Sequence, residues 1–242
     1  MNVSMRNSAG LIPAGWVLQS YADGALCVPA RFAPRASLAW FDVRRPDAVP
    51  VAEGGRQAAW FVEGAQGPAV LRHYRRGGLR ARLGRESYFW LGQGKVRSFA
   101  EVRILGHLRQ AEVRVPAPLG AAYWRAGAFY RNAILVARIP GAQALAGRLD
   151  RADPVAVARS IAAMHDAGVW HADLNAFNIL FDAQDQVWLI DFDRARMGPV
   201  SAGGRRDNLL RLRRSLVKVC GDRGQRWWEG LESACAWCQH LP

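Results

Sequence analysis

The sequence predicts an α+β fold with a small antiparallel N-terminal lobe and a mostly helical C-terminal lobe. Residues 58–74 form a strand-turn-strand pattern, and residues 99–108 place apolar side chains on one helical face. Residues 154–168 have the spacing of an amphipathic helix, and residues 179–190 that of a second strand pair. A chain of 242 residues is long enough to bury a core within two lobes. We expect the lobes to span residues 1–139 and 140–242.

The N-terminal stretch contains one candidate phosphate-binding element. Residues 1–30 mix glycine and proline with short apolar runs, and we expect them to be loop-like. Gly54 and Gly55 precede the first strand of the 58–74 meander. Glycines in such a turn let backbone N–H groups approach phosphates closely. An ordinary hairpin turn explains these two glycines equally well.

The candidate catalytic and metal-binding residues lie within residues 171–193. The segment His171-Ala-Asp-Leu-Asn-Ala-Phe-Asn178 is followed, after a strand pair, by Asp191-Phe-Asp193. Phosphoryl transfer from ATP needs a carboxylate near the acceptor hydroxyl and oxygen ligands for Mg²⁺. Asp173 could take the hydroxyl proton, and Asn178 and Asp191 could hold the metal. A polar loop that caps a strand pair, with a buried His171, is the alternative interpretation.

The strand pair strengthens the catalytic interpretation. Ile179-Leu-Phe181 and Val187-Trp-Leu-Ile190 are strand-like and are separated by a turn at residues 182–185. If the two strands pair antiparallel, Asn178 and Asp191 come to neighbouring strand ends.

These segments resemble the lipopolysaccharide core kinases of the protein-kinase-like superfamily. Within that family, the resemblance is greatest to the kinases of 3-deoxy-D-manno-octulosonic acid (Kdo). Further similar segments are Val70–Gly78, Ile139–Gly141 and Asn208–Leu216, so that the resemblance extends from about residue 50 to residue 218. It implies a bilobal protein-kinase-like fold, with ATP between the lobes. The implied activity is ATP-dependent phosphorylation of the Kdo 4-hydroxyl on lipid A precursor.

The resemblance also assigns roles to individual residues. Arg72 stands where protein kinases carry a phosphate-binding lysine, and Glu101 could orient it. Without the resemblance, a surface glutamate on a helix is the alternative interpretation of Glu101. His171 would support the shape of the loop around the catalytic base Asp173, and backbone groups of 137–139 would face adenine. Asn175 replaces a lysine common in protein serine/threonine kinases, and this favours a small-molecule or glycan acceptor.

The segment after the second strand departs from the protein-kinase pattern. Asp193 stands in place of the glycine of Asp-Phe-Gly, and a non-glycine residue limits backbone rotation there. We therefore expect a constitutively assembled site. His165, on the preceding helix, is expected to be a packed histidine rather than a catalytic residue.

The charge of the chain indicates an anionic partner. The formal net charge is +13, and Lys95 and Lys218 are the only lysines among 33 basic residues. Genomic composition bias explains part of the arginine excess equally well. Kdo–lipid A precursor and an anionic membrane surface are the expected partners, and no nucleic-acid partner is expected. A basic segment at residues 75–97 also carries aromatic residues, and a solvated basic loop is its alternative interpretation.

No signal peptide or membrane-spanning segment is evident, and we expect a location on the cytoplasmic face of the inner membrane or in the cytoplasm. The four cysteines (Cys27, Cys220, Cys235, Cys238) fit reduced thiols. Cys235 and Cys238 have metal-ligand spacing, and His240 with Cys220 could complete a zinc site. Packing near the C-terminus is the alternative.

The C-terminal part predicts a basic amphipathic helix followed by tryptophans. Its apolar stripe contains Leu209, Leu212, Leu216 and Val219, and Trp227, Trp228 and Trp237 follow. Interfacial membrane contact and packing on the catalytic lobe both fit this pattern.

Two alternative functions remain open at this point. A kinase-like phosphotransferase for heptose, an aminoglycoside or a protein would use the same catalytic residues. A protein that binds membranes or nucleic acid on an inactive kinase scaffold would not need them.

Overall fold

The computed structural model describes residues 4–5, 10–51, 59–74 and 87–234. Gly54 and Gly55 lie outside these residues, as do Trp237 and the cysteine pair Cys235 and Cys238. The chain divides into two compact units, and each is described by itself. The first unit comprises residues 1–106 and 117–138, and the second comprises residues 107–116 and 139–242.

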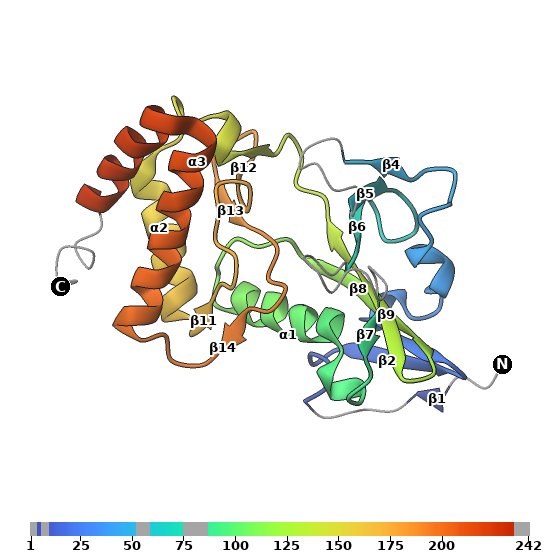
Figure 1. Cartoon of the computed structure of the whole chain (residues 1–242). Helices are drawn as coiled ribbons and strands as arrows, with labels where there is room; N and C mark the ends of the chain where they lie inside the picture. The colour runs from blue at the N-terminus through green and yellow to red at the C-terminus, as the bar shows by residue number, and fades with distance from the viewer. Residues whose placement is uncertain (1–3, 6–9, 52–58, 75–86, 235–242) are drawn as a thin grey trace. The chain divides into compact units, whose positions relative to one another are not determined.

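An antiparallel sheet forms the first unit (Figure 1). Its strands occur in the order β1-β2-β3-β8-β9-β6-β5-β4, with β7 paired to β9. The strand bounds in chain order are β1 (Ser4–Met5), β2 (Trp16–Tyr21), β3 (Gly24–Pro29), β4 (Val49–Pro50), β5 (Ala59–Val62), β6 (Ala69–His73), β7 (Tyr88–Phe89), β8 (Pro118–Ala126) and β9 (Phe129–Ala137). The predicted meander is the β5–β6 pair, with Ala59 opposite Arg72.

The expectation that residues 1–30 form loops is wrong. They contain the β2–β3 hairpin, in which Tyr21 pairs with Gly24 around a two-residue turn. The turn residues are Ala22 and Asp23, and Gly24 is the first residue of β3. Gly24 also faces Trp124 of β8, and a Cβ there would lie 2.2 Å from the Tyr123 carbonyl oxygen. The close approach of β3 to β8 therefore requires glycine at this position.

The two faces of this sheet carry different side chains, because successive residues of a strand point to opposite faces. Leu71 of β6 and Leu135 of β9 belong to a core cluster that also contains Leu26 and Phe41. The neighbouring residue Arg72 points to the opposite face because successive side chains of a strand alternate. That face meets helix α1 (Arg97–Gln110), whose predicted apolar residues are buried.

Three helical segments and two small sheets are described in the second unit besides the end of α1. Helix α2 (Pro154–Asp166) begins with Asp153 as N-cap, which accepts hydrogen bonds from the amides of Val155 and Ala156. The remaining elements are β10 (Gln143–Ala144), the 3₁₀ turn Leu145–Gly147, β11 (Val169–Trp170), β12 (Ile179–Phe181), β13 (Val187–Leu189), β14 (Arg196–Met197) and α3 (Ala202–Ala234). The sheets have the orders β10-β12-β13 and β11-β14.

Helix α3 packs through its apolar stripe. Leu209, Leu212 and Leu216 are buried, whereas Val219 is exposed. Gly221 (φ 56°) interrupts the helix, and beyond it Trp227 is buried and donates its indole N–H to the Ala152 carbonyl at 2.9 Å. Packing is therefore the role of the leucine stripe and of the tryptophans at 227 and 228, rather than membrane contact.

The structure confirms the predicted α+β fold class. Among the described residues, no helix is both long and apolar enough to cross a bilayer. Cys27 and Cys220 are free thiols, and burial raises the pKa of both.

Candidate functional site

The polar loop of residues 171–178 connects β11 to β12 and is folded by its own asparagines. Asn175 accepts a hydrogen bond from the Phe177 amide at 2.9 Å. The side-chain amides of Asn175 and Asn178 both donate to the Asp173 carbonyl oxygen, at 3.0 Å and 2.9 Å. These contacts fix the backbone around Asp173 while its side chain stays 52% exposed. The carboxylate is therefore held on an ordered loop and remains accessible.

His171 lies beneath this loop and is fully buried. Its Nδ1 accepts the Asp173 amide proton at 3.0 Å, so Nδ1 carries no hydrogen. Its Nε2 lies 3.0 Å from the Ile190 carbonyl oxygen and must donate to it. His171 is thus the neutral Nε2–H tautomer, with its ring 4.8 Å from that of Phe192. This geometry suits a residue that supports the loop and leaves no ring nitrogen for proton transfer.

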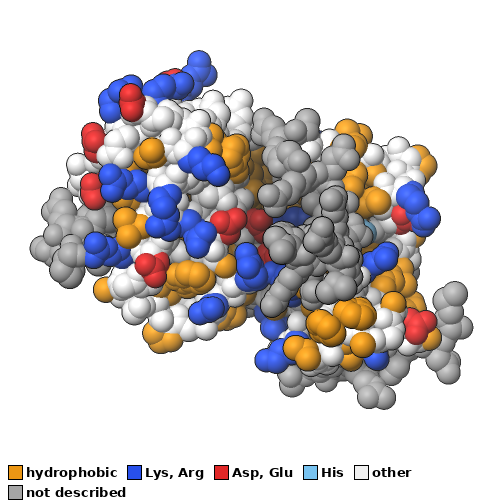
Figure 2. Space-filling view, viewed as in Figure 1, with side chains coloured by type: hydrophobic (Ala, Val, Ile, Leu, Met, Phe, Trp, Pro, Cys, Tyr) orange, Lys and Arg blue, Asp and Glu red, His pale blue; other side chains and the backbone are white. Residues whose placement is uncertain are grey.

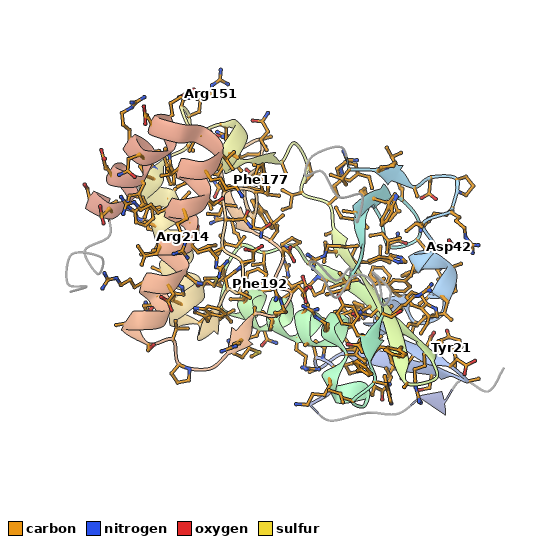
Figure 3. The ribbon with its side chains drawn as sticks, viewed as in Figure 1. Tyr21, Asp42, Arg151, Phe177, Phe192 and Arg214 are labelled. Atoms are coloured by element: carbon orange, nitrogen blue, oxygen red, sulfur yellow. The ribbon has the colours of Figure 1, made fainter. Side chains whose placement is uncertain are left out.

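The predicted metal ligands lie across the β12–β13 hairpin. Asn178 precedes β12, and the Ile190 amide donates to the Asn178 carbonyl at 3.0 Å, so Asp191 comes directly after this contact, just beyond the end of β13. The predicted pairing of these strands is confirmed. Figure 3 labels Phe177 and Phe192, which come from the two segments that carry these ligands.

The Asn178 and Asp191 pair also has the chemistry of a Mg²⁺ site. The side-chain nitrogen of Asn178 is committed to the Asp173 carbonyl, so the amide oxygen is the atom left for a cation. Asp191 has a left-handed backbone (φ 64°), which is uncommon for a non-glycine residue and costs on the order of 1 kcal/mol. Mg²⁺ is typically held by one or two such oxygens together with phosphate oxygens and water. The described residues contain no group of three or more His, Cys, Asp or Glu side chains that could hold a metal.

The turn of the hairpin is itself rigidly held. Asp182 accepts hydrogen bonds from the Gln184 and Gln186 amides, each at 2.9 Å, and from the Trp188 indole at 2.8 Å. Burial alone would raise the pKa of Asp182, but these hydrogen bonds outweigh it and lower the pKa. The turn therefore fixes the register on which the placement of Asn178 and Asp191 depends.

Helix α3 contacts the polar loop of residues 171–178 through side chains that sequence reasoning did not identify. Asn208 contacts His171, Arg211 lies 3.5 Å from the Asp173 carboxylate, and Ser215 accepts the Ala176 amide at 3.1 Å. Their spacing of three and four residues places them on one face of the helix.

Asn208 makes the most extensive of these contacts. It is fully buried, accepts from the His171 amide at 3.1 Å and donates to the His171 carbonyl at 2.6 Å. His165 of α2 donates to the same Asn208 oxygen at 3.0 Å. Burial lowers the pKa of His165 to about 4, so this histidine is neutral near pH 7. His165 is packed, as predicted, and it also orients Asn208.

The first unit carries a separate ion pair at the predicted positions. Nη2 of Arg72 lies 2.6 Å and 2.5 Å from the two carboxylate oxygens of Glu101. Tyr74 donates its hydroxyl to the same carboxylate, and the Arg72 guanidinium lies 5.2 Å from the Tyr74 ring centroid. Glu101 is only 3% exposed, and the charge-assisted hydrogen bonds from Arg72 and Tyr74 compensate the cost of burying its carboxylate. The expected Arg72–Glu101 contact is present, and the role of Arg72 toward phosphates stays a prediction.

The structure describes the backbone expected to face adenine and one of the four proposed zinc ligands. The amides of Ala137 and Arg138 donate to the carbonyls of Ala117 and Pro68, so both are already engaged within the first unit. The Cys220 thiol lies 3.6 Å from the Ala146 carbonyl oxygen, whereas the other proposed zinc ligands lie outside the described part of the chain.

Comparison with known proteins gives consistent matches. Residues 42–233 match the model of the lipopolysaccharide kinase (Kdo/WaaP) family. A 3-deoxy-D-manno-octulosonic acid kinase from Stenotrophomonas maltophilia (strain R551-3) is 49% identical over 178 residues, 72% of each chain. Proteins of the same name from Xanthomonas campestris pv. campestris (strain B100) and Xylella fastidiosa (strain M12) are 45% and 47% identical. These two alignments cover 84% and 76% of this chain and 78% and 75% of the respective relatives.

Proposed function

Because the chain belongs to the lipopolysaccharide kinase (Kdo/WaaP) family, it is an ATP-dependent kinase, and we propose that it phosphorylates the 4-hydroxyl of Kdo on lipid A precursor. The relatives that match it along most of their length carry the name of a Kdo kinase, and this supports Kdo as the acceptor sugar. Kdo phosphorylation places the reaction in the inner-core stage of lipopolysaccharide biosynthesis.

The observation that carries the proposal is the exposed Asp173 carboxylate on a loop held from both sides. In the proposed reaction, the acceptor oxygen forms a bond to the γ-phosphorus of ATP while the bond from that phosphorus to the β–γ bridging oxygen breaks. Asp173 accepts the hydroxyl proton, and ADP leaves with the bridging oxygen. His171 keeps the Asp173 backbone in place.

On the nucleotide side of the proposal, each residue has a role of its own. Asn178 and Asp191 would hold Mg²⁺, which neutralises charge on the β- and γ-phosphates. We assign a phosphate contact to Arg72, oriented by Glu101, because a guanidinium suits phosphate oxygens. Gly54 and Gly55 remain proposed phosphate-loop residues on sequence grounds alone.

The location is also a proposal. A net charge of +13 supports attraction to the anionic cytoplasmic face of the inner membrane, where lipid A precursors present phosphates. Sedimentation with vesicles tests this: we expect binding to vesicles that contain anionic lipid and loss of binding at high salt. Equal binding to neutral vesicles would contradict an electrostatic mode of association.

An acceptor panel tests the proposed activity. The purified chain with Mg²⁺ and radiolabelled ATP is offered Kdo–lipid A precursor, heptosylated core, an aminoglycoside and a generic protein. We expect phosphate transfer to the Kdo acceptor alone. Transfer only to another acceptor would establish a different kinase of the same fold. No transfer to any acceptor, and no effect of Asp173→Asn on vesicle binding, would support an inactive scaffold.

A further inference from the structure

We propose that Arg211 is an acceptor-recognition residue that binds the carboxylate of the sugar acid while Asp173 receives the proton of its hydroxyl. This inference rests on the proposed function, since it assumes an acidic sugar as acceptor. It assigns a specific anion subsite to a residue on α3 that neither the catalytic motif nor the metal-ligand pattern includes.

The first support is the position of the Arg211 guanidinium. Its Nη1 lies 3.5 Å from Oδ1 of Asp173, too long for a good hydrogen bond, and the two side chains are 43% and 52% exposed. An exposed ion pair of this length contributes little to stability. The guanidinium has five donors, and most of them remain available to a ligand that approaches Asp173.

The second support is the rigidity of the element that carries Arg211. Asn208 and Ser215, which precede and follow it on the same face of α3, are both hydrogen-bonded to the catalytic loop. The Cα positions of Arg211 and Asp173 are therefore fixed relative to each other. A site for two groups of one sugar ring needs such a fixed spacing, because a small displacement of the hydroxyl costs much of the rate.

The third support is the charge pattern of the helix. Asn175 leaves the loop itself without the lysine that protein kinases carry near the base, and Arg211 supplies positive charge there from α3. Arg214 and Lys218 follow at helical spacing and are exposed, and together with Arg211 they form the basic flank of α3. Figure 2 shows several Lys and Arg side chains, with other side chains between them, over the part of the molecule where Figure 1 draws α3.

This pattern favours the acceptor over the nucleotide as the ligand of Arg211. The basic flank continues for two helical turns away from Asp173, which is farther than a single γ-phosphate extends. An acceptor that carries a sugar carboxylate and lipid A phosphates has anions spaced over such a distance. The planar fork of arginine also matches a carboxylate bidentately, which lysine cannot do.

The test is a double-mutant-type cycle, in which the Arg211 side chain and the acceptor carboxylate are changed separately and together. Wild type, Arg211→Gln and Arg211→Lys are compared on Kdo–lipid A precursor and on the same acceptor with its carboxylate converted to the carboxamide. For the acid, we expect Arg211→Gln to reduce kcat/KM by roughly 10- to 100-fold, the size of a lost charge-assisted contact. For the carboxamide, wild type and Arg211→Gln should differ by less than about threefold, and Arg211→Lys should recover only part of the loss on the acid.

The matched control is Arg213→Ala, because Arg213 is an exposed arginine of the same helix whose contact is to Gln225. It should leave kcat/KM unchanged on both acceptors. Melting temperatures show that each variant is folded, and direct binding of the acid acceptor gives a readout independent of turnover. We expect Arg211→Gln to weaken that binding by a similar factor.

Three outcomes would overturn the inference. An equal loss on the acid and the carboxamide, mainly in kcat, would mean that Arg211 only positions Asp173. A raised KM for ATP with an unchanged KM for the acceptor would assign Arg211 to the transferred phosphate. If wild type fails to phosphorylate the Kdo acceptor but acts on a neutral one, the proposed function fails first, and the carboxylate subsite falls with it.

Discussion

Asn208 holds both backbone polar groups of His171, accepting from its N–H at 3.1 Å and donating to its carbonyl at 2.6 Å. One buried side chain of α3 thereby fixes the start of the loop of residues 171–178 in the way that a neighbouring strand would. The His171 ring in turn accepts from the Asp173 amide and donates to the Ile190 carbonyl. The shape of this loop is thus held from α3 by a fully buried side chain.

The first prediction concerns Asn208. The Asn208→Ala change leaves the His171 amide, the His171 carbonyl and the His165 donor without their partner in a buried place. We expect a loss of stability of about 1–3 kcal/mol for each group that stays unsatisfied, and a fall in kcat of at least about tenfold. Urea unfolding and steady-state kinetics below the melting transition measure the two effects.

The control for Asn208 is Leu212→Ala, which removes a buried side chain of the same helix that has no hydrogen bond to the loop. It should lower stability by about 2–5 kcal/mol and leave kcat of the folded enzyme nearly unchanged. A normal kcat in Asn208→Ala would show that the loop keeps its shape without this clamp.

The second prediction concerns Asp191, whose backbone is left-handed. The Asp191→Asn variant keeps a side chain that tolerates this conformation and removes only the charge. We expect kcat to fall by about a hundredfold or more, and the Mg²⁺ concentration for half-maximal activity to rise. Asp185→Asn is the matched control, because Asp185 is also left-handed (φ 58°) but lies in the β12–β13 turn. An unchanged Mg²⁺ dependence in Asp191→Asn would remove Asp191 from the metal site.

The third prediction concerns the Arg72–Glu101 pair. Arg72→Ala removes the contacts of the Arg72 guanidinium to the buried Glu101 carboxylate and should destabilise the fold by about 3–5 kcal/mol. The double variant Arg72→Ala/Glu101→Ala should be less unstable than the sum of the single variants, because the two changes are coupled. In the more conservative Arg72→Lys, we expect a raised KM for ATP with the KM for the acceptor unchanged. If the KM for ATP stays at the wild-type value, the pair is structural only.

The fourth prediction is a pH dependence of stability caused by His165. Its folded pKa of about 4 lies below the ordinary value of 6.5, so the unfolded chain binds the proton more readily. The free energy of unfolding therefore has its full value above about pH 6.5. It decreases as the pH falls toward 4, by on the order of 3 kcal/mol in all. Asp166, Arg205 and His171 are the charged or titratable groups that also act on it.

His165→Gln removes this titration while a side-chain amide can still donate to Asn208. Chemical denaturation at pH 4.5, 5.5 and 7 should show a shallower slope of stability with pH in the variant than in wild type. Parallel slopes would mean that His165 is not the group responsible.

The sequence was informative where the contacts are local or follow a repeating rule. The hairpin that brings Asn178 opposite Ile190 follows from two short apolar runs and a polar turn. Arg72 and Glu101 are 29 residues apart, but strand alternation and helix spacing each place their side chain on the expected face. The β2–β3 hairpin was missed because glycine and proline are scattered through this part of the chain, and its turn, Ala22-Asp23, is not one of the dipeptides typical of hairpin turns.

The clamp on the loop could not be predicted in the same way. Asn208 and His171 are separated by 37 residues, and Ser215 and Ala176 by 39, with no pairing rule between a helix and an irregular loop. The available signal was a polar residue beside the leucine stripe of α3, because a buried asparagine must find partners. That signal indicates burial of Asn208 but not the identity of its partner.

The measurement that tests the central claim most directly is single-turnover phosphate transfer by wild type and by Asp173→Asn, with Kdo–lipid A precursor as acceptor. The position of the new phosphate is read by mass spectrometry and ³¹P NMR. We expect wild type to add one phosphate at the Kdo 4-hydroxyl, and Asp173→Asn to retain the wild-type melting temperature and ATP binding while the rate falls by roughly 10²- to 10⁴-fold. A rate in Asp173→Asn within a few-fold of wild type, or a phosphate on another group, would contradict the account.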